Sequence, residues 1–159
     1  MAKRSAGILM YRTGDYELSI LLVHPGGPFW RTKDAGAWSI PKGEVDQDEE
    51  AAAAARREFE EELGTAAPGE LIPLGEIRQK GGKVVEAFAV QGDLDTSRIV
   101  SNSFECEWPP RSGRTQSFPE VDRAEWFTIA AAREKLLESQ WQLLDRLTEA
   151  LACSDRPPL

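Results

Sequence analysis

The sequence predicts a single α+β domain in which helices pack on a mixed β-sheet. Strand-like segments occur in hairpin-like pairs, and two helical regions are inserted among them rather than between every pair of strands. This order argues against a doubly wound parallel sheet, which needs a regular alternation of strand and helix. The chain has 159 residues, enough for one core, so we assign residues 1–159 to one domain, with residues 153–159 as a frayed tail.

The first part of the chain supplies the predicted centre of the sheet. Residues 5–11 are typical of a strand, and a turn at 13–15 leads to a second strand at 17–24. Because residues 17–24 (ELSILLVH) are nearly all apolar, we expect this strand to be central. The loop that follows, residues 24–37, is rich in glycine and proline, and a short strand is expected at 38–41.

The remaining elements complete the sheet and close the chain with a helical region. Gly81 and Gly82 separate two strand-like runs and thereby predict a β-hairpin. The expected elements, in chain order, are a helix at 49–63, strands at 71–80, 83–90 and 103–108, a loop at 109–119, a strand at 124–129, and mostly helix from 130 to 153.

The helix predicted at 49–63 has an apolar stripe that would dock on the sheet. The stripe repeats at intervals of three and four residues and consists of Ala52, Ala55, Phe59 and Leu63. Gly64 follows the helix, where a left-handed backbone suits glycine. At the other end, Asp46 or Asp48 is expected to cap the helix, with Glu49 and Glu50 in its first turn.

The end of this helix is crowded with carboxylates, namely those of Glu58, Glu60, Glu61 and Glu62. Negative charge is unfavourable there, because a helix carries partial negative charge at its C-terminus. At about 100° per residue, Glu58, Glu61 and Glu62 fall within an arc of about 100°, whereas Glu60 points away. Two interpretations are open: a solvated acidic face, or a site for a divalent cation such as Mg²⁺ or Mn²⁺, which prefers carboxylate oxygens.

The spacing around the acidic run favours the second interpretation. Gly43 is followed by five residues and Glu49, and then by seven residues and the run REFEEELGT, residues 57–65. This pattern resembles the Nudix box of the Nudix hydrolases at every fixed position except the last, where Thr65 replaces a bulky apolar residue. That exception concerns packing beneath the loop rather than the chemistry.

The resemblance implies a fold and a reaction. The fold would be an α/β/α sandwich, with a mixed central sheet and helices on both sides. Nudix enzymes hydrolyse a nucleoside diphosphate linked to another group, with the help of divalent cations. By position, Glu58, Glu61 and Glu62 are expected to be ligands of Mg²⁺ or Mn²⁺, and Gly43 is expected to offer its backbone carbonyl.

The resemblance also implies a general base and supporting residues. Glu61 or Glu58 is expected to take the proton from the attacking water. Glu120, in a loop before an aromatic strand, is a further candidate for a metal ligand or base. Glu49 and Arg57 are expected to orient the end of the helix and its glutamates.

The substrate is less strongly indicated. Pro-Lys-Gly at 41–43 resembles Nudix members that act on dinucleoside polyphosphates, diphosphoinositol phosphates or capped RNA ends. Lys42, Arg111 and Arg114 are candidate phosphate ligands. We predict a dinucleoside polyphosphate substrate, with a nucleoside triphosphate or an RNA 5′ end as the alternative. A module that senses a nucleotide without cleaving it is disfavoured, because the box glutamates are all present.

Several aromatic residues and the single histidine are candidates for roles around a substrate. The aromatic residues that could stack on a base are Phe29, Trp30, Trp38 and Trp108, although such residues more often fill the core. His24 follows a core strand and is interpreted as structural.

Composition excludes some functions. The net charge of −8 argues against general binding of nucleic acids or anionic membranes, but it does not exclude a phosphate-bearing substrate whose charge a metal or a local basic cluster offsets. The resemblance implies that the partner is a small nucleotide or polyphosphate. No segment approaches the roughly 20 apolar residues of a membrane span. The two cysteines, Cys106 and Cys153, fit reduced thiols, and the start of the chain does not resemble a signal peptide, so we expect a cytoplasmic location.

Overall fold

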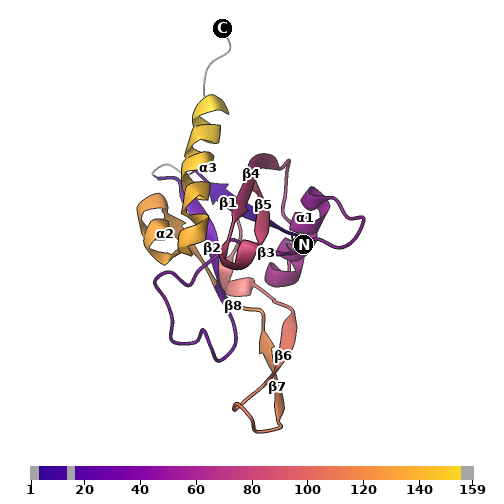
Figure 1. Ribbon diagram of the computed structural model, residues 1–159. Helices are drawn as coiled ribbons and strands as arrows, with labels where there is room; N and C mark the ends of the chain where they lie inside the picture. Colours follow the sequence, from indigo (N-terminus) through magenta and orange to yellow (C-terminus); the bar gives the residue numbers. More distant parts are fainter. Residues whose placement is uncertain (1–3, 14–16, 155–159) are drawn as a thin grey trace.

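The computed structural model describes residues 4–13 and 17–154 and shows a sheet between two helical layers (Figure 1). Its strands are β1 (Arg4–Arg12), β2 (Ser19–Pro25), β3 (Lys42–Glu44), β4 (Ile72–Arg78), β5 (Val84–Gln91), β6 (Ser103–Glu107), β7 (Thr115–Pro119) and β8 (Val121–Thr128). Its α-helices are α1 (Ala51–Leu63), α2 (Ile129–Lys135) and α3 (Trp141–Ser154). Short 3₁₀ helices are η1 (Lys80–Gly82), η2 (Thr96–Arg98) and η3 (Glu138–Gln140).

Strand β1 organises the sheet. Within the described residues, the strand order is β4-β5-β1-β2-β8, and β3 also pairs with β1. Because β1 runs parallel to β5 but antiparallel to β2 and β3, the sheet is mixed as predicted. The apolar strand expected to be central is β2, which lies between β1 and β8. Strands β4 and β5 form the predicted hairpin, with η1 in the connection.

Two hydrophobic clusters lie on opposite faces of the sheet. Phe59 and Leu63 of α1 pack in one cluster together with Ile8 of β1, whereas Leu147 of α3 packs in the other together with Leu9. Successive side chains of a strand point to opposite faces, which is why the neighbours Ile8 and Leu9 belong to different clusters. The predicted α/β/α sandwich is therefore confirmed, with α1 on one side and α2 and α3 on the other (Figure 1).

Helix α1 starts two residues later than predicted and lacks the predicted cap. Glu50 is the N-cap residue and makes no capping side-chain hydrogen bond. The carboxylate of Glu49 instead accepts a hydrogen bond from the backbone N–H of Asp46 at 3.0 Å, ahead of the helix. The predicted end is confirmed, because Gly64 has a φ of 79° and its N–H donates to the carbonyl of Glu60 at 2.7 Å.

The segment predicted as a loop at 109–119 is partly a strand. Its second half is β7, which pairs antiparallel with β6 in a hairpin that projects from the domain (Figure 1). A projecting two-stranded ribbon buries little of either face, so its sequence lacks the apolar alternation that would have revealed it.

Three further boundaries differ from the prediction. The short strand expected at 38–41 forms only isolated bridges, and regular pairing with β1 starts at Lys42. The C-terminal helical region is divided into α2 and α3 by η3. Helix α3 continues to Ser154, while the rest of the predicted tail and most of the turn expected at 13–15 lie outside the described residues. No described helix has the length and apolar character needed to cross a membrane.

A buried glutamine joins the C-terminal helical layer to the segment that leads into β3. Gln140 is fully buried, and its side-chain oxygen accepts a hydrogen bond from the N–H of Ile40 at 3.1 Å. Its side-chain nitrogen donates to the hydroxyl of Ser39 at 3.0 Å. Because β3 starts two residues after Ile40, these bonds fix the direction in which the chain enters the strand that carries Lys42 and Gly43.

We predict that Gln140→Leu lowers the free energy of unfolding by about 1–3 kcal/mol, because the buried N–H of Ile40 loses its partner. Denaturation by urea measures this change. Gln142→Leu, at an exposed position two residues later, is the control and should change the free energy by less than about 0.5 kcal/mol. Equal destabilisation of the two variants would contradict the structural role of Gln140.

Candidate functional site

Three carboxylates meet beside the C-terminal end of α1. Glu58 and Glu62 lie four residues apart and therefore share one face of the helix. Glu120, from the short connection between β7 and β8, faces them. One oxygen from each of the three side chains lies within 4.8 Å of the others. The structure thus brings together two of the predicted box ligands and the predicted loop candidate.

Backbone hydrogen bonds bring Glu120 to α1. The carbonyl of Glu61, in the last turn of the helix, accepts from the N–H of Asn102 at 2.8 Å. The carbonyl of Asn102 in turn accepts from the N–H of Glu120, also at 2.8 Å, and the carbonyl of Glu120 accepts from Gly26 at 2.9 Å. This sequence of bonds joins the end of the helix, the start of the β6–β7 hairpin and the end of β2. Sequence reasoning missed Asn102 and Gly26, because they act through backbone hydrogen bonds, which do not depend on the type of side chain.

Gly43 allows β3 to pass directly against the helix. A Cβ atom at this position would lie 2.0 Å from the carboxylate carbon of Glu58, which is far inside van der Waals contact. Any larger residue would therefore displace either β3 or the Glu58 carboxylate. This close approach places the backbone of Gly43 at the acidic cluster, as the resemblance implies.

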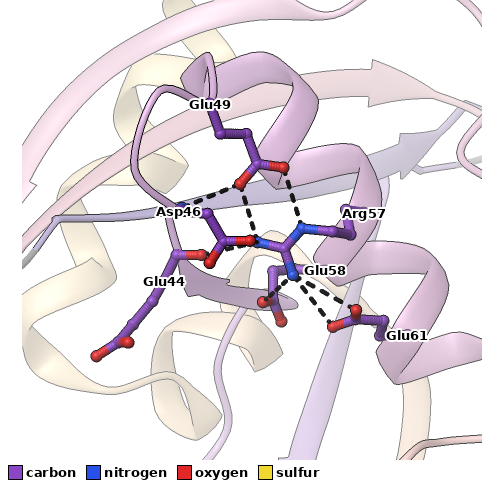
Figure 2. A network of polar contacts seen from close by, with 6 residues as sticks. All are labelled: Glu44, Asp46, Glu49, Arg57, Glu58 and Glu61. Atoms are coloured by element: carbon purple, nitrogen blue, oxygen red, sulfur yellow. Dashed lines mark hydrogen bonds and ion pairs between the residues drawn. The ribbon is translucent and has the colours of Figure 1, made fainter.

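Arg57 connects the two ends of the box (Figure 2). Its guanidinium forms a two-pronged pair with the carboxylate of Glu49, at 3.0 Å for each N–H···O bond, and it donates to Glu58 at 2.9 Å. It also donates to the backbone carbonyl of Glu44 at 2.9 Å, just after Gly43. Its hydrogen bonds to Glu49 and Glu58 raise the pKa of Arg57. The same bonds to Arg57 lower the pKa of Glu49. The pair therefore stays ionised and links α1 to the end of β3.

Glu61 is placed differently from Glu58 and Glu62. Its carboxylate lies 3.4 Å from the guanidinium of Arg57 (Figure 2) and is partly exposed. Glu61 is not one of the three side chains that converge. It still lies close enough to Glu120 to contribute to the raised pKa of that residue. The structure thus places Glu61 at the edge of the carboxylate cluster, on the side of Arg57.

The cluster carries an electrostatic cost. Glu62 is 9 % exposed, and its Oε2 atom is buried without a hydrogen-bond partner among the described residues. Burial, reinforced by the neighbouring Glu58, raises the pKa of Glu62 from 4.5 to about 8. Burial also raises the pKa values of Glu58 and Glu120, each with a smaller contribution from Glu61. Charging all three groups at neutral pH is therefore unfavourable unless something positive lies among them.

The donor set fits a hard divalent cation. Carboxylate oxygens are the ligands preferred by Mg²⁺ and Mn²⁺, and a cation among them would offset their repulsion. The unpartnered oxygen of Glu62 gives a second, independent sign, because a buried polar atom without a partner is costly in a folded protein. Glu58, Glu62 and Glu120 are the residues that could hold such a cation.

A cavity of about 210 Å³ opens beside the carboxylates. Its lining includes Glu62 and Glu120 of the carboxylate cluster together with Lys42, Pro25 and Trp30. Burial lowers the pKa of Lys42, and this effect is opposed by the nearby negative charge of Glu62. The predicted phosphate ligand Lys42 is therefore brought to the carboxylates.

The other predicted substrate contacts are not brought to the cavity. Arg111 and Arg114 lie in the turn of the β6–β7 hairpin, which Figure 1 shows far from α1. At about 3.3 Å per residue, the five residues of β7 alone separate this turn from Glu120 by more than 10 Å. Trp38 is 1 % exposed and belongs to the core. Among the aromatic candidates, Trp30 is the one that lines the cavity.

Known proteins share the sequence pattern and the fold. The sequence profile of the NUDIX domain matches residues 1–147. No curated protein sequence matches the chain significantly. The NUDIX domain of Shewanella oneidensis NrtR, complexed with ADP ribose, has a TM-score of 0.65 at 19% identity, with 95% of this chain and 89% of that chain covered.

Two further solved structures are similar to the same extent. A C. elegans Ap4A hydrolase in a binary complex has a TM-score of 0.63 at 21% identity, covering 96% of this chain and 99% of its own. A mutT/nudix family protein from Listeria innocua has a TM-score of 0.63 at 20% identity, covering 96% and 95%. At identities this low, the structural similarity demonstrates a common fold and nothing more specific.

We predict that metal-free protein becomes less stable as the pH rises from about 5 to 8. The pKa of Glu62 is raised in the folded state, so its contribution to stability is fully present below its ordinary value of 4.5 and is lost as the pH approaches 8. The loss should be on the order of a few kcal/mol, measured by urea denaturation in a chelator. Glu62→Gln should flatten this dependence, whereas Glu60→Gln, at an exposed position of the same helix, should not. Parallel pH profiles for all three proteins would contradict the burial argument.

Proposed function

Because the chain belongs to the Nudix family, we propose that it is a metal-dependent hydrolase that cleaves a pyrophosphate bond in a nucleoside-diphosphate-linked substrate. The observation that carries this proposal is the convergence of Glu58, Glu62 and Glu120, with a buried oxygen of Glu62 unpartnered, beside a cavity that also contains Lys42. A merely solvated acidic face would not bury a carboxylate oxygen without a hydrogen-bond partner.

Specific residues of the chain would hold the cation. Glu58, Glu62 and Glu120 offer carboxylate oxygens, and Gly43 offers a backbone carbonyl next to Glu58. Bound Mg²⁺ or Mn²⁺ would polarise the phosphoryl oxygens and lower the pKa of water at the site. Arg57 keeps Glu58 in place from the other side, through a hydrogen bond of 2.9 Å.

Glu61 is the best-placed candidate for the general base. A carboxylate that is shared with a cation is a weaker proton acceptor, and Glu61 lies outside the converging trio. It is partly exposed and so reachable by water, and Arg57 fixes its orientation at 3.4 Å. Glu58 and Glu120, whose pKa values are raised by burial, are the alternatives.

We propose a dinucleoside polyphosphate as the substrate. Lys42 lines the cavity beside Glu62 and can meet a phosphate chain as a point charge. The fold is shared with a C. elegans Ap4A hydrolase and with a NUDIX domain complexed with ADP ribose. Ap4A and ADP ribose are both nucleotides. A nucleoside triphosphate or an RNA 5′ end remains the second candidate, because Lys42 would serve any substrate with several phosphates. A non-catalytic sensor is the most distant alternative, since the box glutamates are all present.

We predict that hydrolysis depends on Glu62 and on added metal. Glu62→Gln should lower kcat at least about 100-fold at saturating Mg²⁺, because it removes a charged ligand that stabilises the transition state through the cation. The assay should offer diadenosine polyphosphates, nucleoside triphosphates, nucleotide sugars and diphosphoinositol phosphates, with the products identified. Glu60→Gln, on the opposite side of the helix, is the matched control and should keep near-normal activity. Similar activity in the two variants would remove the support for the metal site.

The role of Lys42 gives a second prediction. Lys42→Ala should lower turnover of diadenosine tetraphosphate by about 10- to 100-fold, on the order of the 1.5–3 kcal/mol of a charged hydrogen bond. A nucleotide sugar, which has fewer phosphates, should be affected much less if it is cleaved. Lys42→Arg keeps the charge and serves as the control, and metal affinity should be unchanged in both variants. An equal loss on both substrates would show that Lys42 does not read the number of phosphates.

A further inference from the structure

The single histidine of the chain is buried between two hydrogen-bond acceptors. His24, at the end of β2, is 0% exposed. Its Nδ1 atom lies 2.8 Å from Oδ1 of Asp122, and its Nε2 atom lies 2.6 Å from the backbone carbonyl of Lys33. A carbonyl oxygen can only accept a hydrogen bond, so Nε2 must donate to Lys33.

The other contact joins the ring to β8. Asp122 lies in this strand, and its carboxylate holds the Nδ1 side of the ring at 2.8 Å. The carboxylate of Asp122 also lies 3.7 Å from the guanidinium of Arg123. The buried ring of His24 therefore bridges the side chain of Asp122 and the backbone carbonyl of Lys33.

His24 and Asp122 both lie next to the wall of the cavity. Val23 and Pro25, on either side of His24, line the cavity, as do Glu120 and Val121 just before Asp122. On the third side, the N–H of Lys33 donates to the carbonyl of Trp30 at 2.9 Å, and its ammonium lies 5.1 Å from the centroid of the Trp30 ring. Lys33 therefore connects His24 to Trp30, which lines the cavity.

The loop at 26–37 is anchored on both sides of this point. At its start, Gly26 passes so close to β7 that a Cβ atom would lie 1.9 Å from the carbonyl oxygen of Pro119. At its end, Asp34 accepts from the indole of Trp38 at 2.8 Å and pairs with Lys135 of α2. Between these two ends, Phe29 packs edge-on against Trp108 with ring centroids 6.0 Å apart, and His24 supplies a hydrogen bond from inside the protein to the carbonyl of Lys33.

We propose that His24 is a positioning residue for substrate binding: its ring joins Asp122 to the backbone of Lys33 and so holds Trp30 in the cavity wall. The wall is then formed before the substrate arrives, which reduces the entropy that binding must remove. The effect on substrate binding rests on the proposed function, whereas the anchoring of the loop does not depend on it.

Limited trypsin digestion tests the anchoring. Arg31 and Lys33 are exposed in the loop, and cleavage there reports local opening, whereas cleavage after Arg56 in α1 reports global unfolding. His24→Phe, which lacks both hydrogen bonds, should raise cleavage in the loop at least about tenfold relative to cleavage after Arg56. Asp122→Asn should raise it less, and it keeps the test decisive if His24→Phe does not fold. An unchanged ratio in the folded variants would overturn the proposal.

Binding of Mg²⁺–ADP, measured by calorimetry, connects the loop to the substrate site. We expect Kd to rise roughly tenfold in His24→Phe, and KM for a cleaved substrate to rise similarly while kcat stays within about threefold. Asp145→Asn removes an exposed, hydrogen-bonded carboxylate 3.0 Å from Arg133 and should change none of these quantities. An unchanged Kd despite faster cleavage in the loop would overturn the role in binding, while the absence of any hydrolysis would affect only the proposed function.

Discussion

The acidic end of α1 is held together by the hydrogen bonds and ion pairs that the guanidinium of Arg57 makes. Helix C-termini disfavour negative charge, yet this one carries Glu58, Glu61 and Glu62 within two turns. Arg57 offsets part of that charge by pairing with Glu58 and Glu61, and its two-pronged bond to Glu49 fixes the direction of the guanidinium (Figure 2). The helix end can therefore form without metal, and Glu62 is left as the carboxylate that Arg57 does not reach.

Arg57 does not offset all of the repulsion among the carboxylates, and the remainder bears on the proposed function. A buried carboxylate oxygen without a partner lowers stability, and here the cost falls on Oε2 of Glu62, with Glu58 and Glu120 nearby. The hydrophobic cluster beneath α1, which includes Phe59 and Leu63, keeps the helix in place despite this cost. Under the proposed function, a cation that relieved the repulsion would be bound more tightly for the same reason, because ligand binding and folding are linked. Stability would then be exchanged for affinity at this end of the helix.

The sequence was informative where side-chain type and spacing determine structure. It predicted the apolar stripe of α1 and the end of the helix at Gly64, which the structure confirms. The resemblance singled out Glu49 and Arg57 as supports of the helix end, and the structure pairs these two side chains. It could not show that Glu58 and Glu62 meet Glu120 while Glu61 turns to Arg57, because that choice depends on side-chain rotation and not on helical angle.

Patterns of side chains in the sequence do not reveal backbone hydrogen bonds. Glu120 reaches α1 through the N–H and carbonyl of Asn102, which any residue except proline could provide. The strand β7 was missed for a related reason, since its pairing with β6 is made by backbone groups in an exposed ribbon.

The cavity next to Glu120 is lined mostly by residues outside the box. Glu62 comes from the box, whereas Trp30 and Ala37 come from the loop at 26–37. His24 holds this loop through the backbone carbonyl of Lys33 and not through the side chain of Trp30. Under the proposed function, changes to the side chain of Trp30 would therefore alter what the cavity accepts while Glu58 and Glu62 stay in place. The reaction and the choice of substrate would then depend on different parts of the chain.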